Sequence, residues 1–144
     1  MDTIKVKIAE NETETSNAKE IRRQVFHIEQ GIDLKLDLDG KDDEADHVVA
    51  YSGNEAVGTA RIRHISEKTA KLERVAILKA YRKIGIGRKM VNYIIDYLQK
   101  KGAEEIIIDA QEQAKKFYEG IGFEQKGEVF EEAGILHIKM WKRI

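Results

Sequence analysis

The start of the chain alternates apolar and polar positions, which is the pattern of a half-exposed strand. Ile4, Val6 and Ile8 are each separated by one residue, so their side chains would share one face of an extended segment. A polar run follows over residues 10–17, and apolar residues then recur at helical spacing. They are Ala18, Ile21, Val25 and Ile28. Gly31 comes next, so we expect an amphipathic helix that ends there.

The middle of the chain predicts strands joined by turns. Residues 33–46 are predicted as a loop. Two strands are expected over residues 47–51 and 55–65, and the turn signal at residues 52–54 indicates that they form a hairpin. Another strand is expected over residues 69–78.

Helix and strand patterns alternate through the second half. An apolar stripe made by Met90, Val91, Ile94, Ile95 and Leu98 predicts a helix that begins near Gly87. A strand at 105–109, a short helix at 111–119 and strands at 122–126 and 135–141 complete the chain. Strand, helix and strand over residues 70–109 imply a crossover between parallel strands, whereas hairpins imply antiparallel pairing. The sequence therefore predicts an α/β (α+β) fold with a mixed sheet.

Length and composition narrow the class of protein. We expect one domain over residues 1–144, which is long enough to enclose a core. Lys plus Arg number 25 and Asp plus Glu 26, and the net charge of -1 gives no general attraction to nucleic acid or to an anionic membrane. No run approaches the roughly 20 apolar residues of a membrane span. No cysteine is present, so a thiol nucleophile is excluded, and a cytoplasmic protein is our expectation.

The most informative segment spans residues 75–90, where an apolar strand runs into a basic turn that opens a helix. Gly85 and Gly87 leave room for backbone to approach a ligand, and the free N–H groups of the first helical turn suit an anion. Arg82, Lys83 and Arg88 add positive charge. The glycine spacing does not match a P-loop, and the third glycine of a dinucleotide-binding fingerprint is missing.

Two motifs in order resemble the GCN5-related N-acetyltransferase (GNAT) family. Arg82-x-x-Gly85-x-Gly87 looks like its pyrophosphate-binding motif, and the segment from Phe117-Tyr118 to Gly122-Phe123 looks like its late helix and turn. Shorter stretches resemble the ElaA and YjcF type of branch. The resemblance implies a mostly antiparallel, twisted sheet of about six or seven strands, flanked by helices. Two neighbouring strands of that sheet would splay apart where residues 72–78 meet residues 106–109.

The resemblance also implies acetyl-CoA as the acyl donor and a primary amine, on a small molecule or a peptide, as the acceptor. The N–H groups around Ala76 and Ile77 would then polarise the thioester carbonyl. The positions that the resemblance assigns to the cofactor are Val75, Ala76, Ile77, Arg82, Lys83, Ile84, Gly85, Ile86, Gly87, Arg88, Phe117 and Tyr118.

Glu73 is a candidate base. Strand alternation would place it on the same face as Val75 and Ile77, where it could accept a proton from an ammonium substrate. A cross-strand ion pair with Arg61 or Arg63 is the alternative.

Tyr118 is the candidate general acid, because a phenol near a departing thiolate can donate a proton. The alternative is a core tyrosine, since Ala114, Phe117 and Ile121 share its helical face.

Three residues are candidates for acceptor binding. His137 shares a predicted strand face with Ile135 and Lys139, and a structural role is the alternative. Glu29 and Gln30 end the first helix in a region that shapes the acceptor site of the family, and a solvated helix end explains them equally well. The four histidines form no helical pair, so we expect no metal site.

Residues 29–46 carry eight acidic residues against two lysines. The acids within residues 33–44 could attract a cationic acceptor such as a polyamine, an aminoglycoside or a lysine side chain. An ordinary solvated loop is the alternative.

Our leading hypothesis is an N-acetyltransferase in which the amine attacks acetyl-CoA directly in a ternary complex. The alternative is a non-catalytic module that binds acyl-CoA as a sensor or regulatory subunit. An RNA-binding role lacks exposed aromatic residues and a positive net charge. Dimers are common for this fold, so a homodimer stays open.

Overall fold

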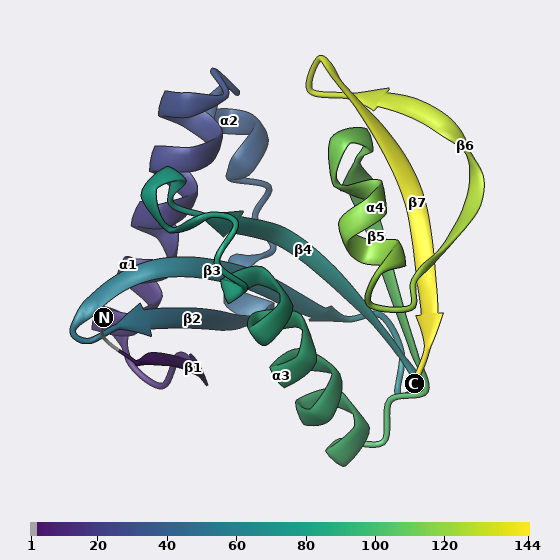
Figure 1. The fold of residues 1–144 in the computed structure, drawn as a ribbon, viewed down its shortest axis with the longest axis horizontal. Coiled ribbons are helices and arrows are strands. Elements are labelled where there is room, and N and C mark those ends of the chain that lie inside the picture. Colours follow the sequence, from purple (N-terminus) through teal and green to yellow (C-terminus); the bar gives the residue numbers. More distant parts are fainter. Residues whose placement is uncertain (1–2) are drawn as a thin grey trace.

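A computed structural model describes residues 3–144 of the chain. Seven strands form one sheet in the order β1-β2-β3-β4-β5-β7-β6 (Figure 1). The strands are β1 (Ile4–Ile8), β2 (Asp46–Ser52), β3 (Glu55–His64), β4 (Thr69–Ile77), β5 (Glu105–Gln111), β6 (Glu124–Glu132) and β7 (Ile135–Arg143). Only β4 and β5 pair in parallel among these strands, and α3 (Ile86–Lys100) makes the crossover between them. The predicted mixed sheet with a central parallel unit is confirmed.

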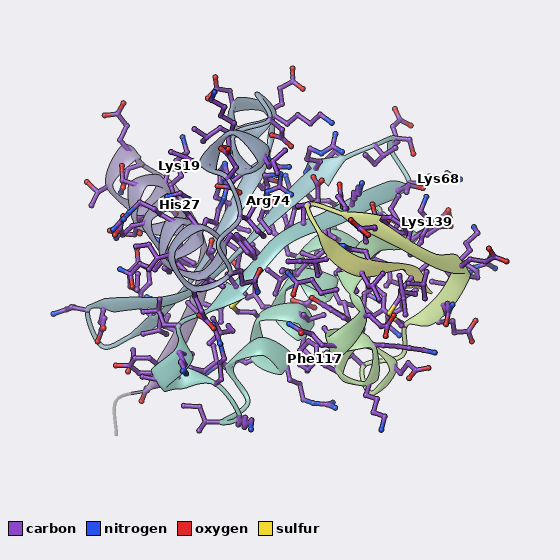
Figure 2. All side chains as sticks on the ribbon, turned by 90° about the horizontal axis from the view of Figure 1, so that it is seen from above. Lys19, His27, Lys68, Arg74, Phe117 and Lys139 are labelled. Atoms are coloured by element: carbon purple, nitrogen blue, oxygen red, sulfur yellow. The ribbon has the colours of Figure 1, made fainter. Side chains whose placement is uncertain are left out.

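Helices cover both faces of the sheet. On one face lie α1 (Glu12–Arg22), the π-helix η1 (Arg23–Glu29) and α2 (Leu34–Asp37). On the other lie α3 and α4 (Lys115–Glu119). Figure 2 shows Arg74 on the side of α1 and α2, and Phe117 on the side of α3 and α4. Short 3-10 turns complete the chain as η2 (Asp42–Glu44), η3 (Lys79–Tyr81) and η4 (Glu112–Ala114). No helix among residues 3–144 is long and apolar enough to cross a membrane.

The two faces of the sheet are packed differently. The main core lies between the sheet and α3, where Met90, Val91, Ile94 and Leu98 are fully buried. The apolar cluster on the opposite face is small and consists of Ile21, Val25 and Ala76, with a few partly buried neighbours. Charged side chains fill much of the remaining space on that face, as described below.

The first helical segment begins earlier than predicted and ends before Gly31, as predicted, but its second half is a π-helix. Asn11 caps α1 by accepting a hydrogen bond from the Glu14 N–H at 2.9 Å, so the polar run belongs to the helix. Farther on, the π-helix η1 adds one residue per turn and rotates the later side chains. Ile28, which we placed on the apolar stripe, is therefore 60% exposed.

A bulge in β4 changes which side chains share a face. Thr59 of β3 lies opposite Ala76, and Arg61 lies opposite Glu73, so β4 has one extra residue between these pairs. Arg74 adopts a φ of 55° at this point, as residues in bulges can. Val75 consequently packs with the α3 core, whereas Glu73 faces Arg61. The expectation that Glu73 lies on the same face as Val75 and Ile77 is wrong.

The expected splay between β4 and β5 is present, but it begins later in β5 than predicted, because residues 106–108 still pair with β4. Their ladder runs from the pair Thr69 and Glu105 to the pair Leu72 and Ile108. β4 then continues to Ile77 and β5 to Gln111 without pairing to each other. Because the ladder stops, backbone groups of β4 beyond Leu72 face an open gap in the middle of the sheet.

Candidate functional site

A cleft of about 760 Å³ occupies the region where β4 and β5 diverge. Its size is that of a small-molecule site. Every residue that the sequence assigned to the site lines this cleft, except Ile84, which is 51% exposed. The structure therefore brings together segments that are up to 108 positions apart in the chain, from Glu29 to His137.

The first turn of α3 opens onto the cleft with unpaired amides. Gly85 is the N-cap residue, with a φ of 91° and no side-chain capping bond. The N–H of Lys89 donates to the Gly85 carbonyl at 3.1 Å, which leaves the amides of Ile86, Gly87 and Arg88 without an acceptor among residues 3–144. A helix of this length offers a partial positive charge at such an end, so the turn suits an anionic group such as a diphosphate.

Gly87 lets an aromatic side chain lie across this turn. A Cβ atom at Gly87 would stand 3.1 Å from Cζ of Phe117, closer than most side-chain contacts. Arg88 donates from Nη2 to the carbonyl of Gly120 at 3.2 Å, which ties α3 to the end of α4. The two sequence motifs, separated by thirty residues, therefore pack directly against each other.

Arg82 links the cofactor half of the cleft to the acceptor half. Its Nε donates to the carbonyl of Ile77 at 2.9 Å, and its two terminal nitrogens each donate to Glu29 at 2.6 Å. The hydrogen bonds from Arg82 lower the pKa of Glu29, and Glu29 raises the pKa of Arg82. The sequence assigned these two residues to different substrates, and the structure joins them.

The backbone of β4 presents one suitable amide to the gap. Leu78 donates its N–H to Val57 of β3 at 2.9 Å. Because successive amides of a strand point to opposite edges, the N–H of Ile77 points away from β3 toward the gap, and that of Ala76 points to β3. Of the two expected carbonyl donors, the geometry favours Ile77.

Tyr118 is both a packed core residue and a residue of the cleft. It is 4% exposed, and its ring meets those of Phe117 and Phe123 edge to face at 4.9 and 5.6 Å. Burial raises its pKa, so the hydroxyl keeps its proton at neutral pH. Burial alone shifts this pKa, with no contribution from a hydrogen bond within residues 3–144, which is compatible with donation from the hydroxyl to a bound substrate.

Glu73 lies among cations. Its carboxylate contacts Arg61 at 3.2 Å, Nε of Arg63 at 2.5 Å and Lys71 at 3.9 Å. The cross-strand ion pair, which we considered as the alternative, is therefore present. A role of Glu73 as base stays a prediction. Its carboxylate lies among cations and not among aliphatic side chains, so the expected apolar surroundings no longer support that role.

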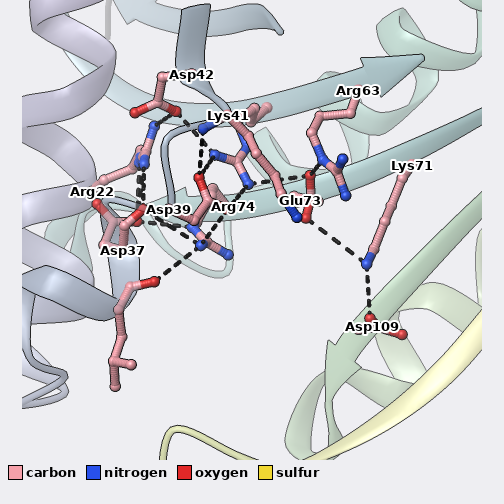
Figure 3. Close-up of polar contacts among 12 residues, drawn as sticks. Arg22, Asp37, Asp39, Lys41, Asp42, Arg63, Lys71, Glu73, Arg74 and Asp109 are labelled. Carbon is pink, nitrogen blue, oxygen red and sulfur yellow. Dashed lines mark hydrogen bonds and ion pairs between the residues drawn. The ribbon is translucent and has the colours of Figure 1, made fainter. Parts of the chain in front are cut away.

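The acidic loop is held down by buried arginines (Figure 3). Arg22 and Arg61, which are 1% and 0% exposed, both contact Asp42, at 2.8 and 3.0 Å. Arg61 also binds Asp39 at 2.8 Å, and Arg22 binds Asp37 at 3.0 Å. The loop is thus not an ordinary solvated loop. Three of the acids that could attract a cationic acceptor, Asp37, Asp39 and Asp42, are paired with arginines of the protein itself.

The sequence did not single out three further residues of the cleft. Gln111 exchanges side-chain hydrogen bonds with Gln30 at 3.0 and 3.4 Å, which joins β5 to the end of η1. Asp109 and Lys71 form an ion pair at 3.0 Å beside the last paired residues of β4 and β5. Asp109 and Gln111 lie at the carboxyl end of a central strand, just after the apolar run of β5, and this was the available signal. Lys71 lies near the start of β4 and had no such signal.

His137 lies on β7 opposite Gln111. Its Nδ1 is 2.8 Å from the carbonyl of Ile135, and its ring stacks on Phe130 at 5.8 Å. The side chain is thus held in place at the cleft wall. Among residues 3–144, no group of three or more metal-ligating side chains could hold a metal ion.

Comparisons with known proteins agree with this geometry. A family model described as an acetyltransferase (GNAT) domain matches residues 10–144. The Bacillus subtilis protein named "Uncharacterized N-acetyltransferase YjcF" is 34% identical over 140 residues, which cover 96% of this chain and 99% of that protein. ElaA from Escherichia coli is 28% identical over 130 residues, which cover 87% of this chain and 84% of that protein.

Solved structures share the fold, and two of them serve as examples. The crystal structure of Escherichia coli ElaA superposes with a TM-score of 0.86 at 24% identity and covers 97% of this chain and 99% of that one. An aminoglycoside 6'-N-acetyltransferase complexed with coenzyme A has a TM-score of 0.79 at 17% identity and covers 96% of each chain.

Proposed function

Because the chain belongs to the GNAT family of N-acetyltransferases, we propose that it transfers an acetyl group from acetyl-CoA to a primary amine by direct attack, with both substrates bound in the one cleft. This proposal rests mainly on one observation. The unpaired amides at the start of α3 and the open gap between β4 and β5 line the same cleft of about 760 Å³.

Acetyl-CoA is the acyl donor of this family, and it supplies the acetyl group as a reactive thioester. The amides of Ile86, Gly87 and Arg88 would hold its diphosphate, because they are unpaired and lie at the positive end of a helix. The amide of Ile77 would donate to the thioester carbonyl oxygen.

Proton transfers complete the proposed reaction. The amine must lose a proton before or during attack, and Glu73 and Asp109 are the carboxylates of β4 and β5 that line the cleft on the acceptor face. Tyr118 would give its proton to the departing thiolate, because its phenol lines the cleft and is protonated at neutral pH. A thiol of ordinary pKa, about 8.5, needs only modest help of this kind.

The test has two parts. Acetyl-CoA should bind, as measured by calorimetry at ligand concentrations up to the millimolar range, and CoA thiol should be released when a panel of primary amines is added. Absence of binding would refute the proposal. Binding without thiol release across the panel would instead support the non-catalytic acyl-CoA sensor.

A further inference from the structure

The segment of residues 34–39 is folded with Asp37 inward and its leucines outward. Its sequence is Leu-Lys-Leu-Asp-Leu-Asp. Asp37 is 8% exposed, whereas Leu34, Leu36 and Leu38 are 39%, 56% and 54% exposed. This reverses the usual distribution, in which carboxylates are solvated and leucines are buried.

Two arginines cause the reversal, Arg22, which is buried, and Arg74, whose side chain is 25% exposed. Asp37 accepts from Nε and Nη2 of Arg22 at 3.2 and 3.0 Å, and Nε of Arg74 lies 2.8 Å from the same oxygen. Nη2 of Arg74 also donates to the carbonyl of Leu36 at 3.3 Å. The segment is short, so turning Asp37 toward the sheet leaves its leucines facing solvent.

One of these leucines reaches the cleft. Leu36 lines it on the acceptor side, together with the apolar side chains of Val25, Phe26 and Ile32. The exposed leucine therefore continues an apolar wall that begins inside the cleft and reaches its mouth.

We propose that this wall selects primary amines that carry an alkyl chain, in preference to polycationic amines. The inference rests on the proposed function, because it names the acceptor class of the same cleft. The amino group enters toward Asp109 and Glu73 at the gap, and its alkyl chain lies against Phe26, Ile32 and Leu36.

The charges that remain on the loop give a polycation little to bind. Asp37, Asp39 and Asp42 are each paired with arginine. The other charged side chains over residues 33–44 are Asp33, Lys35, Lys41, Asp43 and Glu44. Their sum is three negative and two positive charges, which is a net charge of -1.

The first experiment compares amines of increasing chain length. Ethylamine, butylamine, hexylamine and octylamine are assayed by thiol release from acetyl-CoA, with spermidine as the polycation. We expect kcat/KM to rise about threefold for each added methylene until the wall is covered, and hexylamine to exceed spermidine at least tenfold. A flat series, or a preference for spermidine that falls with added salt, would overturn the inference.

The second experiment uses a variant of the wall. Leu36→Ser should flatten the chain-length series, and Leu36→Met should keep it. Ile65→Ser is the matched control, because Ile65 is 48% exposed and does not line the cleft. Leu36→Ser is made at an exposed position, so its melting temperature should equal that of the control within a few degrees. An unchanged series in Leu36→Ser would contradict the assignment.

Two measurements separate this inference from the proposed function. If no amine releases thiol, the proposed function fails, but hexylamine and spermidine can still be titrated by calorimetry into protein saturated with CoA. Tighter binding of hexylamine, lost in Leu36→Ser, would support the apolar wall. The second measurement is the oligomeric state, determined by sedimentation. If the wild type is a dimer and Leu36→Ser is a monomer, a second copy of the chain covers these leucines, and this result would overturn the inference.

Discussion

Arg82 and Glu29 form a bidentate ion pair, with both nitrogen-to-oxygen distances at 2.6 Å. The pair joins the turn before α3 to the last residue of η1. Nε of Arg82 also donates to the carbonyl of Ile77. One side chain therefore connects the end of β4, the helix η1 on the acceptor side and the cradle, by which we mean the turn at Gly85 and the unpaired amides of Ile86, Gly87 and Arg88. A change in the charge of either residue should therefore alter ligand binding in the other half of the cleft.

Glu29→Gln should tighten acetyl-CoA binding at low salt. The substitution removes a negative charge beside the cradle and leaves Arg82 free to face the diphosphate. Because both partners are partly exposed, we expect an effect of about two- to fivefold in the dissociation constant, measured by calorimetry at 50 mM and 300 mM salt. Arg82→Ala should weaken binding.

Glu20→Gln is the control for this substitution. Glu20 pairs with Arg23 on the exposed side of the first helix, outside the cleft. Equal affinity changes in the Glu29 and Glu20 variants would show that the effect comes from net charge alone.

Tyr118→Phe should lower kcat much more than it changes the KM for acetyl-CoA. The ring contacts with Phe117 and Phe123 remain, and no hydrogen bond contributes to the pKa of the hydroxyl within residues 3–144, so stability should hold. Loss of a general acid costs about a hundredfold or more in rate. Tyr93→Phe, outside the cleft on α3, controls for loss of a tyrosine hydroxyl. Equal kcat in wild type and Tyr118→Phe would remove the acid assignment.

Arg61→Met should destabilise the fold strongly. Arg61 is fully buried and contacts Asp39, Asp42 and Glu73, so its removal leaves carboxylates without their cation. Breaking a buried pair in this way costs about 3–5 kcal/mol in free energy of unfolding, which urea denaturation measures. Arg23→Met breaks a pair that is about half exposed and should cost at most about 1 kcal/mol. Similar losses in the two variants would contradict a structural role for the buried network.

Stability should fall on acidification because of this network. The hydrogen bond from Arg61 lowers the pKa of Asp39 well below its ordinary value. A lowered pKa means that the unfolded chain binds more protons, so the stabilisation is complete above about pH 5 and is lost as the pH falls through the acid range.

Urea denaturation between pH 3 and pH 6 checks this prediction. Asp39→Asn should reduce the slope of unfolding free energy against pH. Asp43→Asn should leave the slope unchanged, because Asp43 makes no ion pair with residues 3–144. If the Asp39 variant keeps the wild-type slope, the pH dependence arises elsewhere.

Much of the fold could be predicted from the sequence because its signals are local. The period of two in residues 4–8 gave β1 at its observed bounds. The apolar stripe ending at Leu98 gave α3 to within one residue at its start. The spacing of Arg82, Gly85 and Gly87 pointed to a helix with unpaired amides, which depends only on the conformation of one turn.

Errors arose where distant residues change a local pattern. Strand alternation assumes a strand without a bulge. The extra residue at Arg74 places the side chains of Glu73 and Val75 on opposite faces of the sheet. Helical spacing assumes 3.6 residues per turn, and η1 turns Ile28 outward. Neither irregularity has a signal in its own segment that we could identify.

The sequence by itself determined the strands, the helices and the cradle, because each depends on the period of neighbouring side chains or on the backbone freedom of Gly85. Only the tertiary structure decided the character of the acceptor side. Asp37 and Asp39 are acids that any reading of the chain would place in water, yet Arg22, Arg61 and Arg74 draw them toward the sheet. The physical reason is that a buried guanidinium needs a carboxylate nearby, and which carboxylate supplies it depends on how the chain folds back on itself.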